Sequence, residues 1–165
     1  AANAPTGLCP EQSAIWSYPL TDGDREEVVF NMVNAMTQRI HQSGHLANLS
    51  PERMALVKEA LECYKSIRDD IKRSVPFWPL GLSHIGDEWV TLGLKAGNKA
   101  YLAVWRRQGS NECCNIPIRY ATEKAKVSCI YPSFDEGGHK FNPLSRSLSV
   151  KLPECFTARL FEVEL

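Results

Sequence analysis

Residues 74–89, SVPFWPLGLSHIGDEW, mark the place where the hydrophobic pattern of the chain changes. Prolines and glycines interrupt this stretch so often that neither a helix nor a long strand can continue through it. The interrupting residues are Pro76, Pro79, Gly81 and Gly86. Apolar residues recur at helical spacing before the stretch and at strand spacing after it. We therefore expect two domains, one at residues 1–80 and one at residues 85–165.

Two amphipathic helices are predicted before the boundary. The first runs from Asp24 to about Ile40, with Asp24 as N-cap and Glu27 as its N3 partner, and Gly44 ends it. The second opens at Ser50, which a proline follows. The apolar stripes are Val29, Met32, Val33, Met36 and Ile40 on the first helix and Met54, Val57, Leu61, Tyr64, Ile67 and Ile71 on the second.

These stripes exceed what two helices and one short aromatic segment, PEQSAIWSYP at residues 10–19, can cover by themselves. We infer that the stripes lie against strands that this stretch of chain does not contain. The helical half is thus expected to be part of a larger domain.

After the boundary the apolar period becomes two, which is typical of strands. The alternating runs are Val90–Leu94, Tyr101–Trp105, CCNIPI at 113–118, AKVSCIYP at 125–132, Leu148–Leu152 and Phe161–Leu165. The longest turn-rich connection is DEGGHKFNP at residues 135–143. About six short strands with this spacing indicate an antiparallel sandwich. Helices lie almost only before the boundary, so the class is α+β rather than a regular β-α-β alternation.

The segment YLAVWRRQG, residues 101–109, ends a strand-like run with an aromatic residue and two arginines. We interpret it as a sandwich strand that places Trp105 or Val104 in the core and leaves Arg106 and Arg107 at its solvent end. The alternative is a basic aromatic platform that binds a glycan.

Charge and composition exclude several classes of function. The 165 residues hold 19 Lys and Arg against 19 Asp and Glu, so the formal net charge is zero. Nothing here favours binding to nucleic acid or to an anionic membrane. No apolar run approaches the roughly 20 residues of a membrane span, and no targeting segment is visible, so the localisation stays open.

Patterns for metal binding, cofactor binding and catalysis are missing. His41 and His45 have the spacing of two ligands on a helix, but Gly44 lies between them and no acidic residue accompanies them, so we predict no metal site. Each acidic residue falls in a cap, a helix surface, a strand or a turn, and none is predicted to be catalytic. The six cysteines form no C-x-x-C pair, which leaves their oxidation state open.

Glu11, Gln12, Trp16 and Tyr18 are the candidate binding residues. Aromatic faces cover the C–H patches of a pyranose, while carboxylate and amide groups bond to its hydroxyls. The alternative is that Trp16 and Tyr18 belong to the core.

Four segments, taken in order, resemble the carboxyl-terminal part of glycoside hydrolase family 36 α-galactosidases. They are PEQSAIWSYP, YKSIRDDIKRSVPFWPLGL, YLAVWRR and ARLFEVEL, and the likeness covers nearly the whole chain. It implies the last helices of a (β/α)8 TIM barrel followed by a small antiparallel β-sandwich. The implied barrel segments are residues 3–19 around strand seven, 24–42 for the next helix, 43–49 for the strand-eight region and 50–74 for the last helix.

The resemblance implies a retaining enzyme that hydrolyses terminal α-linked galactose in raffinose-type sugars or galactomannans without a cofactor. The two catalytic aspartates would lie on barrel strands outside this chain, so the chain alone is expected to be inactive. Its partners would be the remainder of the catalytic barrel and, through the complete enzyme, a galactosyl oligosaccharide; a homo-oligomer is compatible with the resemblance. Barrel sites lie at the carboxyl ends of strands, so Glu11, Gln12 and Trp16, expected after strand seven, are predicted to bind substrate.

Two alternatives stay open. One is a non-catalytic carbohydrate-binding or assembly module. The other is a relative that transfers galactose between sugars instead of hydrolysing them.

Overall fold

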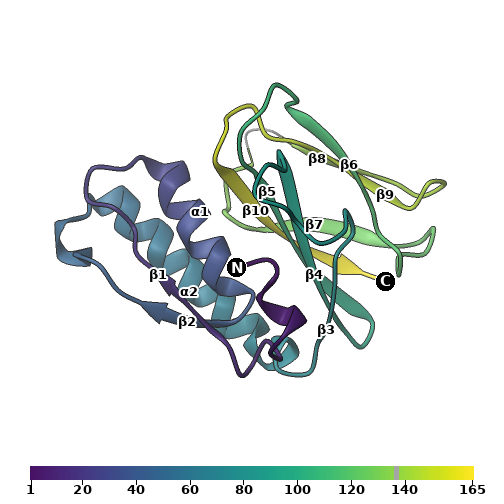
Figure 1. Cartoon of the computed structure of the whole chain (residues 1–165), viewed down its shortest axis with the longest axis horizontal. Coiled ribbons are helices and arrows are strands. Elements are labelled where there is room, and N and C mark those ends of the chain that lie inside the picture. The colour runs from purple at the N-terminus through teal and green to yellow at the C-terminus, as the bar shows by residue number, and fades with distance from the viewer. Residues whose placement is uncertain (136–137) are drawn as a thin grey trace.

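The computed structural model describes residues 1–135 and 138–165. A helical part and a β-sandwich pack side by side (Figure 1). The helical part contains the 3-10 turns η1 (Ala4–Thr6) and η2 (Leu46–Asn48), the strands β1 (Ala14–Ser17) and β2 (Arg39–Gln42), and the helices α1 (Arg25–Met36) and α2 (Pro51–Ile71). The remaining strands are β3 (Val75–Phe77), β4 (Trp89–Ala96), β5 (Lys99–Arg106), β6 (Cys113–Pro117), β7 (Lys126–Tyr131), β8 (His139–Asn142), β9 (Ser147–Lys151) and β10 (Thr157–Glu164).

Both helices begin at the predicted caps. The Asp24 carboxylate accepts a hydrogen bond from the Glu27 amide at 2.8 Å, and the Ser50 hydroxyl accepts one from the Arg53 amide at 3.4 Å. Each cap satisfies a backbone donor that the helix itself leaves without a partner. The two helix starts predicted from the sequence are confirmed.

The first helix is shorter than predicted, because α1 ends at Met36 and β2 begins at Arg39. The Arg39 amide donates to the Ser13 carbonyl at 3.2 Å, which starts a parallel ladder between β1 and β2. Ile40 fits a helical stripe and a strand equally well, so periodicity alone could not separate the two. One β-α-β unit is therefore present in the helical part, and the expectation of a strand at residues 43–49 is wrong, since the strand lies at Arg39–Gln42.

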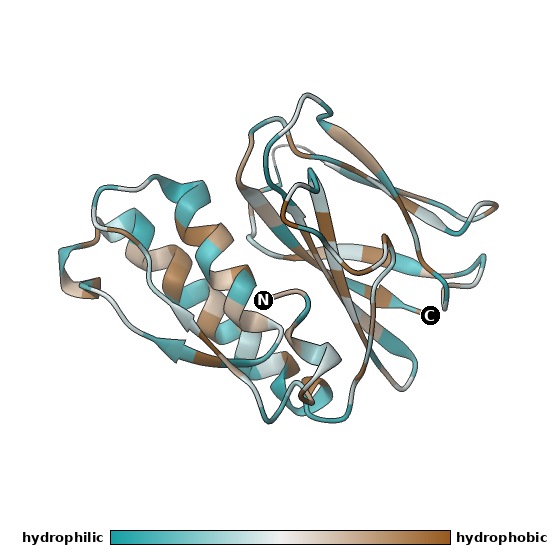
Figure 2. Ribbon diagram, viewed as in Figure 1, coloured by the Kyte–Doolittle hydropathy of each residue, from teal (hydrophilic) through white to brown (hydrophobic). Residues whose placement is uncertain are grey.

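The apolar stripes of the helices are covered mainly by the chain's own residues, so the expectation that they lie against strands outside the chain is wrong. The stripe residues with at most 4% exposure are Val29, Met32, Val33, Met36, Val57, Ile67 and Ile71. They share one core with a face of the sheet that includes Leu92, Leu94 and Trp105. Hydrophobic segments are prominent along both helices and these strands (Figure 2). The surface without cover lies instead on β1 and β2.

The strands after the boundary form the predicted antiparallel sandwich. One sheet has the order β3-β4-β5-β10-β7 and the other the order β6-β9-β8. A second core, with Leu102, Ile116, Leu148 and Phe161, fills the space between the two sheets. The larger sheet is thus covered on one face by the small sheet and on the other by the helices, which explains the continuous burial along β5.

The arginine pair after Trp105 is only partly where we expected it. Val104 lies in the core of the sandwich and Trp105 in the core shared with the helices, since they point to opposite faces of β5. Arg106 is buried, and its guanidinium donates to the carbonyls of Leu152 at 2.6 Å, Pro153 at 2.7 Å and Gly109 at 2.9 Å. The prediction that Arg106 lies at the solvent end of the strand is therefore wrong. Three backbone carbonyls accept the hydrogen bonds that water would otherwise accept from its guanidinium.

The interrupted segment contributes a short strand of its own. β3 pairs with β4, with Phe77 opposite Gly93, so the larger sheet takes in residues before the expected start of the second domain. The division into residues 1–80 and 85–165 stays a prediction. In the predicted connection at 135–143, residues 139–142 form β8, and residues 136–137 lie outside the described part of the chain.

Candidate functional site

The open face of the parallel pair β1 and β2 is the most conspicuous uncovered surface of the helical part. Trp16 and His41 are opposite one another in the register, and their rings meet edge to face with centroids 6.2 Å apart. Trp16 is 69% exposed. The other face of the pair is covered, since the Ser17 hydroxyl contacts the Met32 sulfur at 3.1 Å and Ile40 packs against the helical core.

The carboxyl end of β1 leads into a loop that α1 and α2 hold in place. Glu27 accepts hydrogen bonds from the Leu20 amide at 3.2 Å, and Arg53 donates to the carbonyls of Thr21, at 2.8 Å, and Leu20. Arg53 also forms an ion pair with Glu27 at 3.3 Å. Burial raises the pKa of the Glu27 carboxyl, and the Leu20 amide and the Arg53 guanidinium oppose that rise. Glu27 and Arg53 together therefore hold the loop after β1 in position.

Two further contacts join the carboxyl ends of the two strands. The Gln42 side-chain amide donates to the carbonyls of Ser17 and Ser43, each at 3.2 Å. Gly44 has φ of +92°, a conformation that favours glycine, and it lies against the ring of Tyr18. Tyr18 is half-exposed, so an aromatic side chain is presented at this end of the pair.

The structure separates the three predicted substrate-binding residues. Trp16 lies within β1 on the open face, whereas Glu11 and Gln12 precede β1 and lie at its amino end. The prediction that all three residues follow the strand is wrong, because none of them lies after β1. His41 was considered only as a metal ligand, although the period-two pattern of RIHQ would have put it beside Trp16 if the strand had been recognised.

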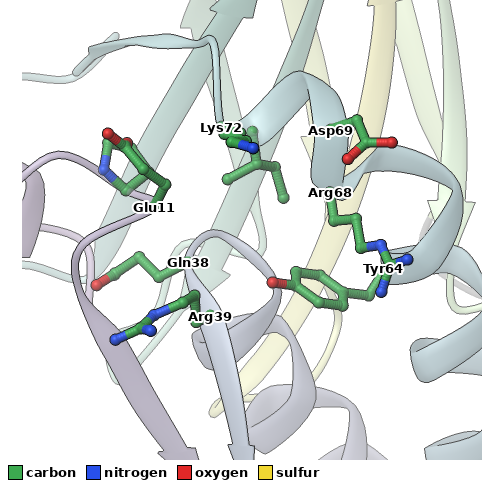
Figure 3. Close-up of a pocket in the computed structure, with 9 residues that line it drawn as sticks. Glu11, Gln38, Arg39, Tyr64, Arg68, Asp69 and Lys72 are labelled. Carbon is green, nitrogen blue, oxygen red and sulfur yellow. The ribbon is translucent and has the colours of Figure 1, made fainter.

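Glu11 instead lines a pocket of about 280 Å³ at the amino ends of β1 and β2. Its other charged walls are Arg39, Arg68, Asp69 and Lys72, and the Tyr64 hydroxyl points into it (Figure 3). Barrel enzymes carry out their chemistry at the opposite, carboxyl ends of the strands. This pocket is therefore not at the end where a barrel site would form.

Within residues 1–135 and 138–165, no group of three or more His, Cys, Asp or Glu side chains could hold a metal ion. All six cysteines are unpaired in this structure. No helix in the described part is long and apolar enough to cross a membrane.

Comparison with solved structures shows which proteins share this fold. The GH36 α-galactosidase AgaA from Geobacillus stearothermophilus, in complex with stachyose, matches with a TM-score of 0.68 and 10% identity over 94% of this chain and 22% of that chain. The α-galactosidase from Lactobacillus brevis matches with a TM-score of 0.65 and 10% identity over 92% of this chain and 22% of that chain. The fold is that of a C-terminal part of GH36 α-galactosidases, as the resemblance predicted.

The likeness extends to other glycoside hydrolases. An α-amylase from Anoxybacillus matches with a TM-score of 0.63 and 6% identity over 84% of this chain and 32% of that chain. The chain spans about a fifth of the length of the α-galactosidases it matches. No sequence model of a known family matches the chain. Its sequence also has no match among curated proteins.

Proposed function

We propose that this chain is the C-terminal portion of a retaining α-galactosidase, with the last two β-α units of a TIM barrel at residues 1–80 and a C-terminal sandwich at 85–165. The whole protein would hydrolyse terminal α-linked galactose from raffinose-type sugars or galactomannans. The fold shared with GH36 α-galactosidases supports the hydrolase context. The order β1-α1-β2-α2, with parallel strands, is the alternation of which such barrels are built.

The single observation that carries this proposal is the open face of β1 and β2. Parallel sheets occur almost only with both faces covered, and they rarely consist of two strands alone. Here one face packs on the helices while Trp16 and His41 stand on the other without cover. In a closed barrel that face would point into the interior, and further strands would pair with the free edges.

The catalytic carboxylates would come from the remainder of the barrel. A retaining enzyme needs two carboxyl groups about 5 Å apart, one as nucleophile and one as acid and base. Of the acidic residues that follow β1, Asp24 caps α1, Glu27 is bound to Arg53 and Glu26 is bound to Arg159, whereas Asp22 lies exposed in the loop. We therefore assign no catalytic residue and no cofactor to this chain.

Trp16 is our proposed substrate contact. Trp16 lies one residue before the carboxyl end of β1, so its ring would stand near the mouth of the barrel, where an aromatic face can cover the apolar side of galactose. Replacing Trp16 by alanine in the full gene product should raise KM for the galactoside by about tenfold. This factor corresponds to the loss of a binding free energy of roughly 1.4 kcal/mol from one aromatic contact. The matched control is Ile85→Ala, which alters another exposed side chain on the far segment before β4. Unchanged kinetics together with unchanged thermal stability in Trp16→Ala would remove this residue from the site.

The proposed activity is tested by initial rates of the full gene product on p-nitrophenyl α-galactoside and on raffinose. Release of nitrophenol and of free galactose is expected, and the isolated chain should release neither. Because the α-amylase of Anoxybacillus shares the fold, a maltooligosaccharide is the comparison substrate. Cleavage of the maltooligosaccharide alone would overturn the assignment to galactosides. Efficient galactose transfer with poor hydrolysis would identify the transferring relative, and no turnover at all would favour a binding or assembly module.

A further inference from the structure

A second pocket lies where the sandwich meets the start of α1, away from the open face of β1 and β2. Its volume is about 260 Å³. Phe30 and Asn31 of α1 line one side, and the segment Glu154–Phe156, which leads into β10, lines the other. In Figure 1 the beginning of β10 lies beside α1, and the ion pair between Arg159 and Glu26 joins the two elements.

Phe156 is the unusual residue of this pocket. Its φ is +57°, a left-handed conformation that costs a bulky side chain energy and that asparagine or glycine would adopt more easily. Its side chain is nevertheless 56% exposed, so core packing does not explain why a phenylalanine stands here. Its ring meets the Phe30 ring edge to face, with centroids 6.5 Å apart. The backbone is held by a hydrogen bond from the Phe156 amide to the Arg107 carbonyl at 2.8 Å.

The polar walls exclude an anion, which leaves a cation or a neutral ligand that carries hydroxyl groups as the ligands that fit. Every charged side chain lining the pocket is acidic, so an anion would be repelled. Two of these acids are already neutralised, because Glu26 binds Arg159 at 2.8 Å and Glu27 binds Arg53 at 3.3 Å. Glu154 remains as an acceptor, together with the Asp24 oxygen that does not accept from the Glu27 amide, and hydroxyl groups are the donors that such acceptors bind in a sugar.

The pocket adjoins the carboxyl end of β1. The Asn31 side chain, which lines it, accepts a hydrogen bond from the Tyr18 amide at 3.2 Å. Glu27 lines the pocket as well and binds the Leu20 amide in the loop after β1. Asn31 and Glu27 therefore connect this pocket to the segment at the carboxyl end of β1, the end at which a barrel site would form.

We propose that the pocket between Phe156 and Asn31 is a subsite for a neutral sugar residue of an extended oligosaccharide, with the Phe156 ring as its apolar platform. The proposal rests on the proposed function for the identity of the sugar. In this proposal the sandwich also takes part in substrate binding, through the segment Glu154–Phe156 that leads into β10.

Binding of stachyose to the chain Ala1–Leu165, followed by heteronuclear NMR, tests the proposal. Saturable shifts are expected at Phe30, Asn31 and Glu154 at concentrations of about 10 mM or below. Phe156→Ala should weaken this binding by roughly five- to tenfold, as for loss of one aromatic contact. Phe156→Trp keeps an aromatic ring and should keep the binding.

Phe156→Asn distinguishes the contribution of the aromatic ring from that of the backbone conformation, since asparagine tolerates the left-handed conformation but has no ring. It should lose binding as Phe156→Ala does, without loss of thermal stability. Tyr120→Ala is the control, because it removes an aromatic ring that does not line this pocket. The proposal is overturned by absent shifts, by undiminished binding in Phe156→Ala, or by choline binding in the pocket in place of stachyose.

The two proposals fail in different ways. An inactive full gene product whose C-terminal chain still binds stachyose at Phe156 would remove the galactosidase and keep the subsite. An active full gene product whose C-terminal chain shows no shifts at this pocket would keep the galactosidase and remove the subsite.

Discussion

Arg159 is almost completely buried on β10, and its charge is balanced by groups from two other segments. Its guanidinium binds the two Glu26 oxygens at 2.8 and 2.9 Å, and Asp135 lies 3.7 Å from its Nε. It also lies over the Phe134 ring, with 5.2 Å to the centroid. A buried ion pair of this kind joins α1 to the sandwich, and removal of Glu26 leaves the buried Arg159 charge with only the more distant Asp135 as its partner.

Glu26→Gln should therefore lower the free energy of unfolding by about 3 kcal/mol, as measured by urea denaturation. The matched control is Glu62→Gln, which breaks an exposed pair with Lys65 and should cost at most about 0.5 kcal/mol. The double variant Glu26→Leu with Arg159→Met should be more stable than Glu26→Gln alone, because no unpaired charge remains. Equal, small losses in both single variants would show that the pair does not hold the two parts together.

Tyr101 and Asp70 form a second link between the helices and the sandwich. The Tyr101 hydroxyl donates to the Asp70 carboxylate at 2.6 Å. This hydrogen bond lowers the pKa of Asp70, with burial acting in the opposite sense and Arg73 assisting. A carboxyl group whose pKa is lower in the folded state stabilises the fold above its unfolded pKa, and that contribution is lost as the pH falls.

Tyr101→Phe should thus reduce the free energy of unfolding by about 1 to 2 kcal/mol at neutral pH. The difference between wild type and variant should narrow as the pH falls below the unfolded pKa of an aspartate, about 3.9, and through the lower folded pKa of Asp70. Tyr120→Phe, whose ring lies on the Phe77 side of the sheet, is the control and should show no such pH dependence. A difference for Tyr101→Phe that is constant from pH 7 to about pH 3 would contradict this assignment of the Asp70 shift.

At the level of elements, β3 depends on a glycine in the neighbouring strand. Phe77 of β3 is opposite Gly93 of β4, and its ring occupies the space that a Cβ at Gly93 would fill. The absence of a side chain therefore lets an aromatic ring lie across the strand. This contact fixes the end of the segment that joins α2 to the sandwich.

Gly93→Ala should destabilise the protein by more than about 1 kcal/mol, because the ring of Phe77 must move. Combined with Phe77→Ala, which removes the ring, it should cost clearly less than the sum of the single changes. Gly7→Ala is the control, since a Cβ there has open space around it. Additive losses in the double-mutant cycle would mean that Phe77 and Gly93 are energetically independent.

Elements set by local signals could be predicted from the sequence, whereas those set by distant partners could not. The caps at Asp24 and Ser50 depend on amides three residues away, and both were found. β2 depends on a parallel partner strand 25 residues earlier in the chain. Without that partner in view, the apolar spacing of its four residues predicted the end of a helix. Arg106 is buried because carbonyls 46 and 47 residues away accept its hydrogen bonds, and no local pattern contains that information.

The site illustrates the same limit. Trp16 could be proposed from the sequence because its aromatic character is intrinsic, but its position on an open strand face became visible only with the structure. Glu11 and Gln12 were placed on the wrong side of the strand because the start of β1 at Ala14 has no sequence signal. Phe156 was not singled out at all, and an aromatic residue with positive φ cannot be recognised from its neighbours in sequence.

For the whole molecule, the central sheet explains how two differently built halves form one unit. Helices cover one of its faces and the small sheet covers the other, so most of the apolar surface is buried by the chain's own residues. The parallel pair β1 and β2 is the exception, since one face and the outer edges lack partners among the described residues. Our central claim is that the remaining strands of a barrel complete this pair.

Hydroxyl-radical footprinting of Trp16 tests that claim most directly, by comparing the isolated chain with the full gene product. Trp16 is 69% exposed here, so it should be oxidised rapidly in the isolated chain. In a completed barrel it should be protected by about tenfold or more, while Leu144, which is 85% exposed on the sandwich, reacts equally in both. Equal oxidation of Trp16 in the two proteins would contradict the claim that further strands cover β1 and β2.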